Sequence, residues 1–340
     1  MHNAIRGHEN PALDLAMQLA CQNGLPLLVY HGLSEKYPFA SDRHHTFILQ
    51  AARDVQREFA EMGVAYAFHL ERAGHRGPHL RDLARRAAVL VTESMPVAPL
   101  VAWTERLKGL VKTPIVSVDT TCILPIGVAA RLAQIDSLPK STVCQASRYR
   151  DLTAIEYGDR IGLGYETLCG DQTPDASELV PMRLDSLDLG FDLVDLQDVC
   201  LSELIGHCKI DHAVGPVADS PGGARAGYER WQRFLNEGLV QYAKRRNDPA
   251  DWLGGSRLSA YLHYGMVSPF RVGREAAANG ESAGVVKFLD EFLIWREMSF
   301  HFCDLHSDEL DSLEAIPCWA AEQLRKHGNC LLYTSPSPRD

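Results

Sequence analysis

The stretch FLDEFLIWREMSFHF, residues 288–302, sets the helical character of the C-terminal half of the chain. Its apolar side chains recur at spacings of three and four, which is the period of one helix face. The stripe begins slightly upstream and consists of Val285, Phe288, Leu289, Phe292, Trp295 and Phe302. An earlier stripe with helical spacing consists of Trp231, Phe234, Leu235, Leu239 and Tyr242. The chain from about residue 224 onward is therefore predicted to be all-helical.

The first 125 residues follow a different pattern, in which short apolar runs alternate with amphipathic segments. Runs typical of buried strands lie at 25–33, 64–70, 87–93 and 114–119, and helical patterns lie at 10–24, 41–61, 79–86 and 97–110. Strands that alternate with helices imply right-handed crossovers and a parallel sheet covered on both faces. The predicted fold class is thus an α/β domain followed by an all-α domain.

Composition along the chain suggests four parts. We expect an α/β domain over residues 1–125 and a helical domain over 221–329. Between them, 126–220 is rich in Pro, Gly and Asp, which predicts an interdomain linker with short helices. The last piece, 330–340, has Ser-Pro repeats without packing periodicity and is predicted to be a disordered, non-native tail.

The overall composition excludes several classes of protein. The 340 residues carry a formal net charge of −10 and contain no apolar run long enough to cross a membrane. Nine scattered cysteines without a C-x-x-C pair argue against a disulfide framework or a structural zinc site. No secretory signal is visible, and no histidine has metal-ligand spacing. We expect a cytoplasmic, metal-free protein whose nucleic-acid binding would need a local basic patch.

The segment GGSRLSAYLHYG, residues 254–265, is a candidate phosphate site. Its glycines permit positive φ and close approach of the backbone to a ligand. Ser256 and Ser259 would bring hydroxyl groups to a helix start, where free N–H groups and the helix dipole favour an anion. The alternative is that the serine only caps the helix.

Three segments of the C-terminal half, in their order and spacing, resemble the flavin-binding domain of the DNA photolyase and cryptochrome family. They are PGGARAGYERWQRFLNEGLVQYAKRRNDP (221–249), SRLSAYLHYGMVSP (256–269) and the stretch 288–302, and the last is similar to class II photolyases. The N-terminal half agrees through ENPALDLA (9–16), FASDRHHTFIL (39–49) and VSVDTTCILP (116–125). One departure is Trp295, where the class II pattern leads us to expect arginine.

The resemblance implies a Rossmann-like N-terminal domain, a helical FAD-binding domain, and light-driven repair of cyclobutane pyrimidine dimers in UV-damaged DNA. It also implies an antenna chromophore of folate or deazaflavin type, whose residues we do not assign. We expect a monomer. The alternatives are a cryptochrome-like blue-light photoreceptor without repair activity, or an inactive fragment that lacks a complete flavin pocket. The family continues through further helices after residues 288–302, so the chain is predicted to be truncated at both ends.

The resemblance also assigns individual residues. The expected flavin phosphate site is Gly255, Ser256, Arg257, Leu258 and Ser259, and the other expected flavin contacts are Tyr242, Phe288 and Arg296. Glu291 matches the glutamate that contacts the lesion, and Trp295, one turn later, would stack on a flipped base. The alternative for Tyr242 and Trp295 is an ordinary place in the core.

A lesion that leaves the duplex to reach a flavin needs a cationic rim for its phosphates. Arg246, Arg271 and Arg274 are the predicted DNA-binding residues of that rim, with Lys244, Arg245 and Arg257 close by in the sequence. The alternative is a scatter of solvated surface charges.

Overall fold

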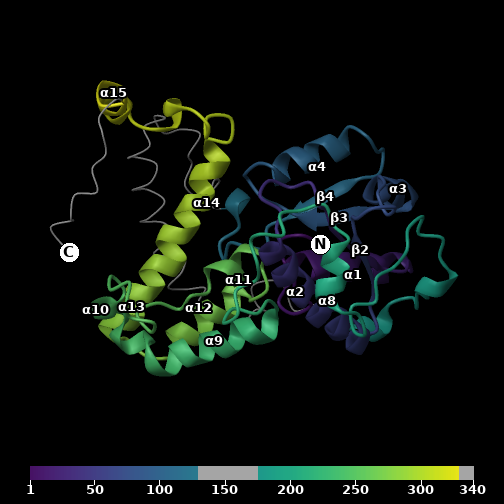
Figure 1. The fold of residues 1–340 in the computed structure, drawn as a ribbon, viewed down its shortest axis with the longest axis horizontal. Coiled ribbons are helices and arrows are strands. Elements are labelled where there is room, and N and C mark those ends of the chain that lie inside the picture. Colours follow the sequence, from purple (N-terminus) through teal and green to yellow (C-terminus); the bar gives the residue numbers. More distant parts are fainter. Residues whose placement is uncertain (129–174, 329–340) are drawn as a thin grey trace.

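The computed structural model describes residues 1–128 and 175–328, and its N-terminal half contains all four strands that it describes (Figure 1). In chain order the elements of that half are α1 (Pro11–Asn23), β1 (Leu28–Leu33), α2 (Asp42–Met62), β2 (Ala65–Leu70), α3 (His79–Arg86), β3 (Leu90–Glu93), α4 (Leu100–Lys108) and β4 (Ile115–Val118). Each lies within two or three residues of the position that the sequence pattern predicts. The α/β class is therefore confirmed, and the chain turns after α1 at Gly24, whose φ is 59°.

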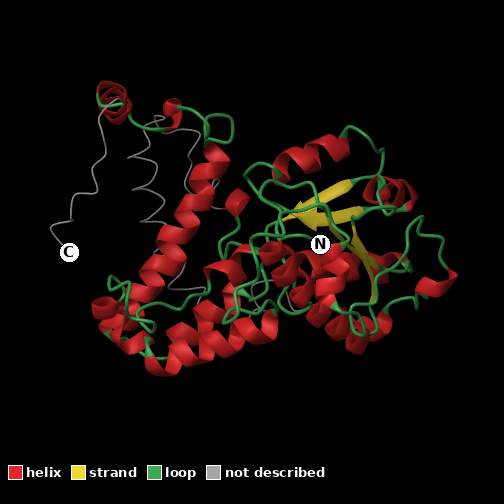
Figure 2. Cartoon of the chain, viewed as in Figure 1, coloured by secondary structure: helices red, strands yellow, loops and turns green. Residues whose placement is uncertain are grey.

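All the regular elements that the structure describes after residue 174 are helices, joined by loops, as Figure 2 shows by colour. The elements are η2 (Ala176–Glu178), η3 (Leu184–Ser186), α8 (Leu201–Gly206), α9 (Ala224–Glu237), η4 (Leu239–Gln241), α10 (Tyr242–Arg245), α11 (Ser259–His263), α12 (Pro269–Ala277), α13 (Ala283–Leu289), η5 (Asp290–Trp295), α14 (Arg296–Leu305), η6 (Leu313–Ala315) and α15 (Cys318–Lys326). The all-α character of this half is confirmed. Part of the predicted linker and the whole predicted tail, 330–340, lie outside the described residues.

The strands form two parallel pairs rather than one ladder. β1 pairs with β2 from Leu28 opposite Ala65 onward, and β3 pairs with β4 from Leu90 opposite Ile115 onward. The start of the chain bridges the two pairs, because the Met1 ammonium donates to the Tyr30 carbonyl of β1 at 2.9 Å. The next residue, His2, donates its N–H to the Glu93 side chain of β3. Instead of the one parallel sheet that was expected, the described strands form two parallel pairs.

One core runs through both halves. Helix α2 packs its apolar face against the sheet, with Val55 and Phe59 almost fully excluded from solvent. In the helical half, Trp231 and Phe234 of α9 are buried against Phe288 of α13, with ring centroids 5.5 and 5.6 Å apart. No helix of the described residues is long and apolar enough to cross a membrane.

Residues 175–199 run along the α/β half. Val194 donates its N–H to the Phe68 carbonyl of β2 at 3.2 Å, and Leu196 is fully buried. The Arg53 guanidinium of α2 donates to the Leu196 carbonyl at 2.6 Å and to the Val199 carbonyl at 2.7 Å. This part of the predicted linker is therefore packed against the first half.

Buried histidines should make the protein less stable in mild acid. Burial lowers the pKa of His31 to about 3 and the pKa of His45 and His69 to about 4. In the unfolded chain these groups titrate near pH 6.5. The unfolded state thus binds more protons below that pH, so stability is complete above pH 6.5 and falls toward pH 4. We expect each such histidine to cost up to about 2 kcal/mol between pH 6.5 and 5.

Urea unfolding at pH 7.5 and 5.0 measures this loss directly. The variant His31→Gln should flatten the pH dependence, because it removes a group that is 2% exposed and bonded to the Tyr66 hydroxyl at 2.7 Å. The exposed His207 provides the matched control, since His207→Gln should leave the dependence unchanged. Equal unfolding free energies at the two pH values would contradict the prediction.

Candidate functional site

Helices α13 and α14 are joined by the π-helical turn η5, which carries Glu291 and Trp295. A π-helical turn has i→i+5 hydrogen bonds and occurs often at functional sites. The continuous helix predicted over 285–302 is thus interrupted in its hydrogen bonding. Glu291 and Trp295 are four residues apart in this turn. They therefore do not lie one above the other, as they would in the regular α-helix that was predicted.

Two cations hold the Glu291 carboxylate. Arg246, directly after α10, places Nη1 2.9 Å from Oε1, and Lys287 of α13 places Nζ 2.8 Å from the same oxygen. Lys287 also pairs with Asp290 at 2.7 Å. The structure therefore joins one predicted lesion residue and one predicted DNA-binding residue, and it adds Lys287, which the sequence analysis did not select.

Tyr242 lies beside this cluster. Burial raises the pKa of the Tyr242 hydroxyl, and the neighbouring Glu291 charge adds to that effect. The Tyr242 ring meets Phe288 edge-on at 5.5 Å, and Phe288 stacks on Phe292 at the same centroid distance. Phe288 is only 5% exposed and packs among aromatic side chains. Its burial identifies it as a core residue, and its flavin contact stays a prediction.

Trp295 ends the π-helical turn and is 43% exposed. The alternative that placed Trp295 in the core is therefore wrong. A half-exposed indole offers a flat apolar face for stacking. The role in base stacking stays a prediction.

The turn at residues 254–258, before α11, differs from the expectation in two details. Positive φ occurs at Arg257 (53°) and at neither Gly254 nor Gly255. Gly254 is required for another reason, because a Cβ there would lie 2.7 Å from the Arg245 carbonyl oxygen. The residue that caps α11 is Leu258, which is 1% exposed, so neither serine is the cap.

The remaining phosphate-site candidates keep polar groups available. Ser259 is exposed at the first position of α11, and Ser256 is half-buried. The Arg257 guanidinium lies 3.6 Å from the centre of the exposed Trp252 ring. Hydroxyls, a guanidinium and the first N–H groups of a helix are donors that suit a pyrophosphate. Leu258 contributes only backbone, since its side chain is buried.

Arg296 and Glu297 join helix α14 to the loop after β4. Arg296 donates to the Thr121 carbonyl at 3.1 Å, and burial lowers the pKa of its guanidinium. Glu297 is fully buried and accepts the N–H groups of Ile123 at 2.6 Å and Leu124 at 3.2 Å. Burial raises the pKa of Glu297 well above its usual value, against the effect of these two N–H donors. The sequence analysis missed Glu297, whose one signal was a charge on an otherwise apolar helix face.

The other two arginines of the predicted rim lie in different surroundings. Arg271 pairs with Glu275 at 2.8 Å, and its guanidinium lies 4.1 Å from the Tyr228 ring centre. Arg274 pairs with Glu9 at 2.6 Å. Like Arg246, both guanidinium groups have carboxylate partners, and their place at a DNA-binding rim stays a prediction. Of the three, only Arg246 is brought to Glu291.

No group of three or more His, Cys, Asp or Glu side chains within residues 1–128 and 175–328 is placed to hold a metal ion.

Solved structures share the architecture described above. The chain aligns with a bacterial class III photolyase from Agrobacterium tumefaciens with a TM-score of 0.59, over 91% of this chain and 58% of that one, at 15% identity. A cryptochrome from Synechocystis aligns with the same TM-score over 89% of this chain and 60% of its own, at 13% identity. The fold is that of the photolyases and cryptochromes.

Curated relatives agree with the fold. A deoxyribodipyrimidine photo-lyase of Methanothermobacter thermautotrophicus is 26% identical over 328 residues, which cover 96% of this chain and 65% of the relative. One from Potorous tridactylus is 25% identical and covers 95% and 56%. No protein-family model matches. Together these findings support the assignment of the chain to the DNA photolyase/cryptochrome family.

The chain spans 65% and 56% of the lengths of these two relatives.

Proposed function

We propose that the chain supports FAD-dependent, light-driven repair of cyclobutane pyrimidine dimers in DNA. The observation that carries this proposal is the ion-pair cluster of Glu291, Arg246 and Lys287. The cluster lies beside Tyr242, and the π-helical turn that carries Glu291 also exposes Trp295. The names of the curated relatives support the same reaction class. We further propose a monomeric, cytoplasmic protein with domains at 1–125 and 221–329, and an antenna chromophore whose site stays unassigned.

FAD would be held by Tyr242 and by the turn from Gly255 to Ser259, with Arg296 nearby. This donor set suits a dinucleotide, since it combines exposed Ser259, half-buried Ser256 and the Arg257 guanidinium. Reduced FAD would supply the electron for repair. Phe288 lies against the Tyr242 ring and would support it, and its own contact with the flavin is part of the proposal.

The protein side of the reaction is electrostatic. A dimer that gains an electron carries negative charge on its pyrimidine carbonyl oxygens, and donors already in place stabilise such charge. Arg246 and Lys287 both approach Oε1 of Glu291, and in our proposal the Glu291 side chain stabilises the charge on the lesion through a bridging donor. Trp295 would stack on a base that has left the helix.

The second candidate is a blue-light photoreceptor without repair activity. The structural likeness favours it as much as repair, because the Synechocystis cryptochrome and the class III photolyase align with equal TM-scores. A third candidate is a chain that does not complete a flavin pocket.

One experiment separates the three. The purified protein is examined for flavin absorption and then assayed for dimer loss from irradiated DNA under blue light. Repair supports the proposal, flavin without repair favours the photoreceptor, and a protein that takes up no FAD favours the incomplete pocket.

Arg246 provides a prediction about binding to DNA. Replacing Arg246 with alanine should weaken binding to an oligonucleotide with one thymine dimer about tenfold, or about 1.4 kcal/mol. The variant should also show a smaller slope of the logarithm of the binding constant against the logarithm of the salt concentration. The slope should fall by the amount expected for about one phosphate contact, because one cation is lost. Fluorescence anisotropy over a series of salt concentrations measures both. Arg233, exposed on α9 and 3.9 Å from Glu237, is the matched control, and equal losses in both variants would count against Arg246.

A further inference from the structure

The N-terminal segment from Asn3 to Asn10 is inserted between the two halves of the molecule. Arg6 in this segment is fully buried, although it carries a charge. Its Nη1 donates to the Gly265 carbonyl at 2.9 Å, and its Nη2 donates to the Thr120 carbonyl at 3.1 Å. Gly265 lies between α11 and α12, and Thr120 follows β4. One guanidinium therefore binds backbone of both halves.

Glu9 lies in a backbone conformation that most residues avoid. Its φ is 41°, and its carbonyl accepts both Nε and Nη2 of Arg6 at 3.1 Å. The Glu9 side chain binds α12 at two points. It accepts a hydrogen bond from the hydroxyl of Ser268, just before the helix, at 2.5 Å, and one from Arg274 Nη2, within the helix, at 2.6 Å. Ser268 is the residue that caps α12, through its bond from the Arg271 N–H. Strained backbone that persists is a mark of functional constraint.

The corner between α11 and α12 touches the segment directly. Gly265 has a φ of 61°, and a Cβ there would lie 1.9 Å from the Asn3 carbonyl oxygen. Ile5 donates its N–H to the Tyr264 carbonyl at 3.1 Å. The corner therefore cannot move without moving the N-terminal segment.

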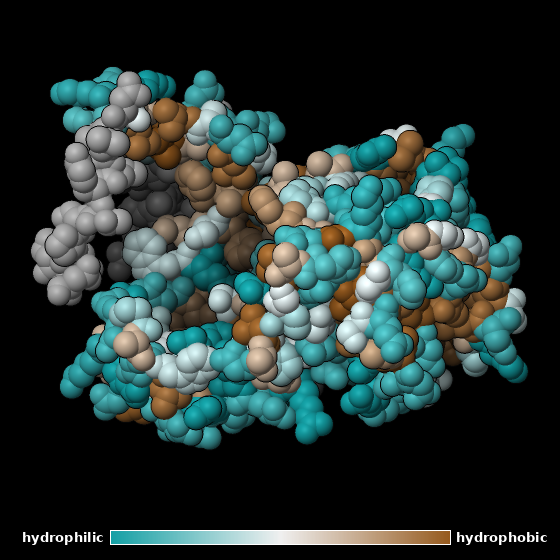
Figure 3. Space-filling view, viewed as in Figure 1, coloured by the Kyte–Doolittle hydropathy of each residue, from teal (hydrophilic) through white to brown (hydrophobic). Residues whose placement is uncertain are grey.

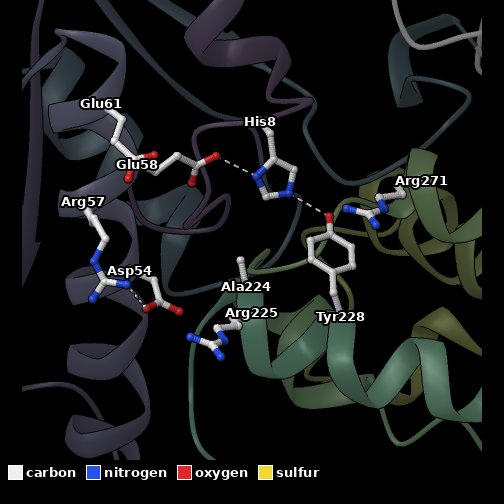
Figure 4. Close-up of a pocket in the computed structure, with 9 residues that line it drawn as sticks. All are labelled: His8, Asp54, Arg57, Glu58, Glu61, Ala224, Arg225, Tyr228 and Arg271. Atoms are coloured by element: carbon white, nitrogen blue, oxygen red, sulfur yellow. Dashed lines mark hydrogen bonds and ion pairs between the residues drawn. The ribbon is translucent and has the colours of Figure 1, made fainter.

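His8 adds a third contact, shown in Figure 4. Its Nδ1 lies 2.8 Å from the Glu58 carboxylate of α2, and its Nε2 lies 2.7 Å from the Tyr228 hydroxyl of α9. Tyr228 in turn accepts the Ser268 N–H at 2.9 Å. The network gives a consistent direction, in which Tyr228 O–H donates to His8 and His8 N–H donates to Glu58. Ser268 is thus fixed through both its hydroxyl and its N–H.

We propose that Arg6 and Glu9 are positioning residues for the turn at 255–259, which they control through the α11–α12 corner. Helix α11 has five residues and is only about 7 Å long, so its first residue, Ser259, is coupled closely to the corner at its other end. This inference rests on the proposed flavin function only where it names FAD as the ligand of the turn.

The test compares Arg6→Lys and Glu9→Gln with a matched core variant, Val55→Ala. A lysine cannot reach three carbonyl groups as the guanidinium fork does. Glu9→Gln is the milder change, since it keeps the shape and removes the charge that faces Arg274. Val55 is 1% exposed in α2, so its truncation lowers stability without touching the corner.

Two measurements are made on each full-length variant. Amide hydrogen exchange over residues 257–268 should become at least tenfold faster in Arg6→Lys and less so in Glu9→Gln, whereas Val55→Ala should affect the α2 region. The dissociation constant for FAD, measured on apoprotein by flavin fluorescence, should rise at least tenfold in Arg6→Lys and stay unchanged in Val55→Ala.

Unchanged exchange over 257–268 in both segment variants would overturn the inference. Faster exchange with unchanged FAD affinity would also overturn it, because the contacts would then be merely structural. If Arg6→Lys does not fold, Glu9→Gln decides by the same criteria. If the wild-type protein takes up no FAD, the proposed function fails, and the exchange measurement alone decides whether Arg6 and Glu9 position the turn.

Discussion

Replacing Glu291 with alanine is expected to reduce light-driven dimer repair roughly 100-fold, while the protein remains folded and retains its flavin. The carboxylate is 28% exposed and lies beside Arg246 and Lys287, whose ammonium and guanidinium groups remain solvated without it. Its loss should therefore cost little stability. The repair step should instead be slowed, because the variant lacks the group that is proposed to stabilise the charge on the pyrimidine carbonyl.

The measurement is the rate of dimer loss per absorbed photon, with flavin content determined from the same sample. Glu291→Gln should retain more repair than alanine, because an amide can still donate a hydrogen bond to a carbonyl oxygen. Glu229 on α9, paired with Arg225 at 3.0 Å, is the matched surface control, and Glu229→Ala should repair normally. Normal repair by Glu291→Ala would remove the carboxylate from the reaction.

Replacing Gly284 with alanine is expected to destabilise the helical half by about 3 kcal/mol. A Cβ at this buried position in α13 would lie 2.2 Å from the Leu239 carbonyl oxygen and 2.3 Å from that of Val240. Both are backbone atoms of η4, so they cannot rotate away as a side chain would. Helix α13 must then shift away from α10, which separates Lys287 and Glu291 from Arg246.

Urea unfolding gives the free energy, and FAD affinity reports the shift of α13. Gly206, at the end of α8, is the matched control, because nothing lies within 4 Å of a Cβ built there. Gly206→Ala should be neutral or stabilise by up to about 1 kcal/mol, since alanine favours a helix over glycine. Equal stabilities of the Gly284 and Gly206 variants would show that α13 and η4 are not in close contact in solution.

Figure 3 shows apolar and polar residues mixed over one face of the molecule. Because the chain carries a net charge of −10, DNA binding would depend on local basic groups such as Arg246.

The order of strands and helices in the first 125 residues follows from the sequence, because it depends on local periodicity. A helix such as α2 shows its own period and ends at Gly63, and a strand such as β2 shows a short apolar run. The helical stripes of the second half were predicted for the same reason, and Trp231, Phe234 and Phe288 are buried as expected. The family resemblance added Glu291, and the need for cations near the DNA phosphates added Arg246, although no local pattern relates two residues 45 positions apart.

Packing in three dimensions settled what periodicity does not specify. The π-helical turn changes the direction of Trp295, and Leu258 rather than a serine caps α11. Arg271 and Arg274 were expected at a DNA rim, yet they pair with Glu275 and Glu9. Contacts such as Arg6 with Gly265 join residues separated by most of the chain, and they arise because a buried charge must find acceptors wherever the folded chain provides them.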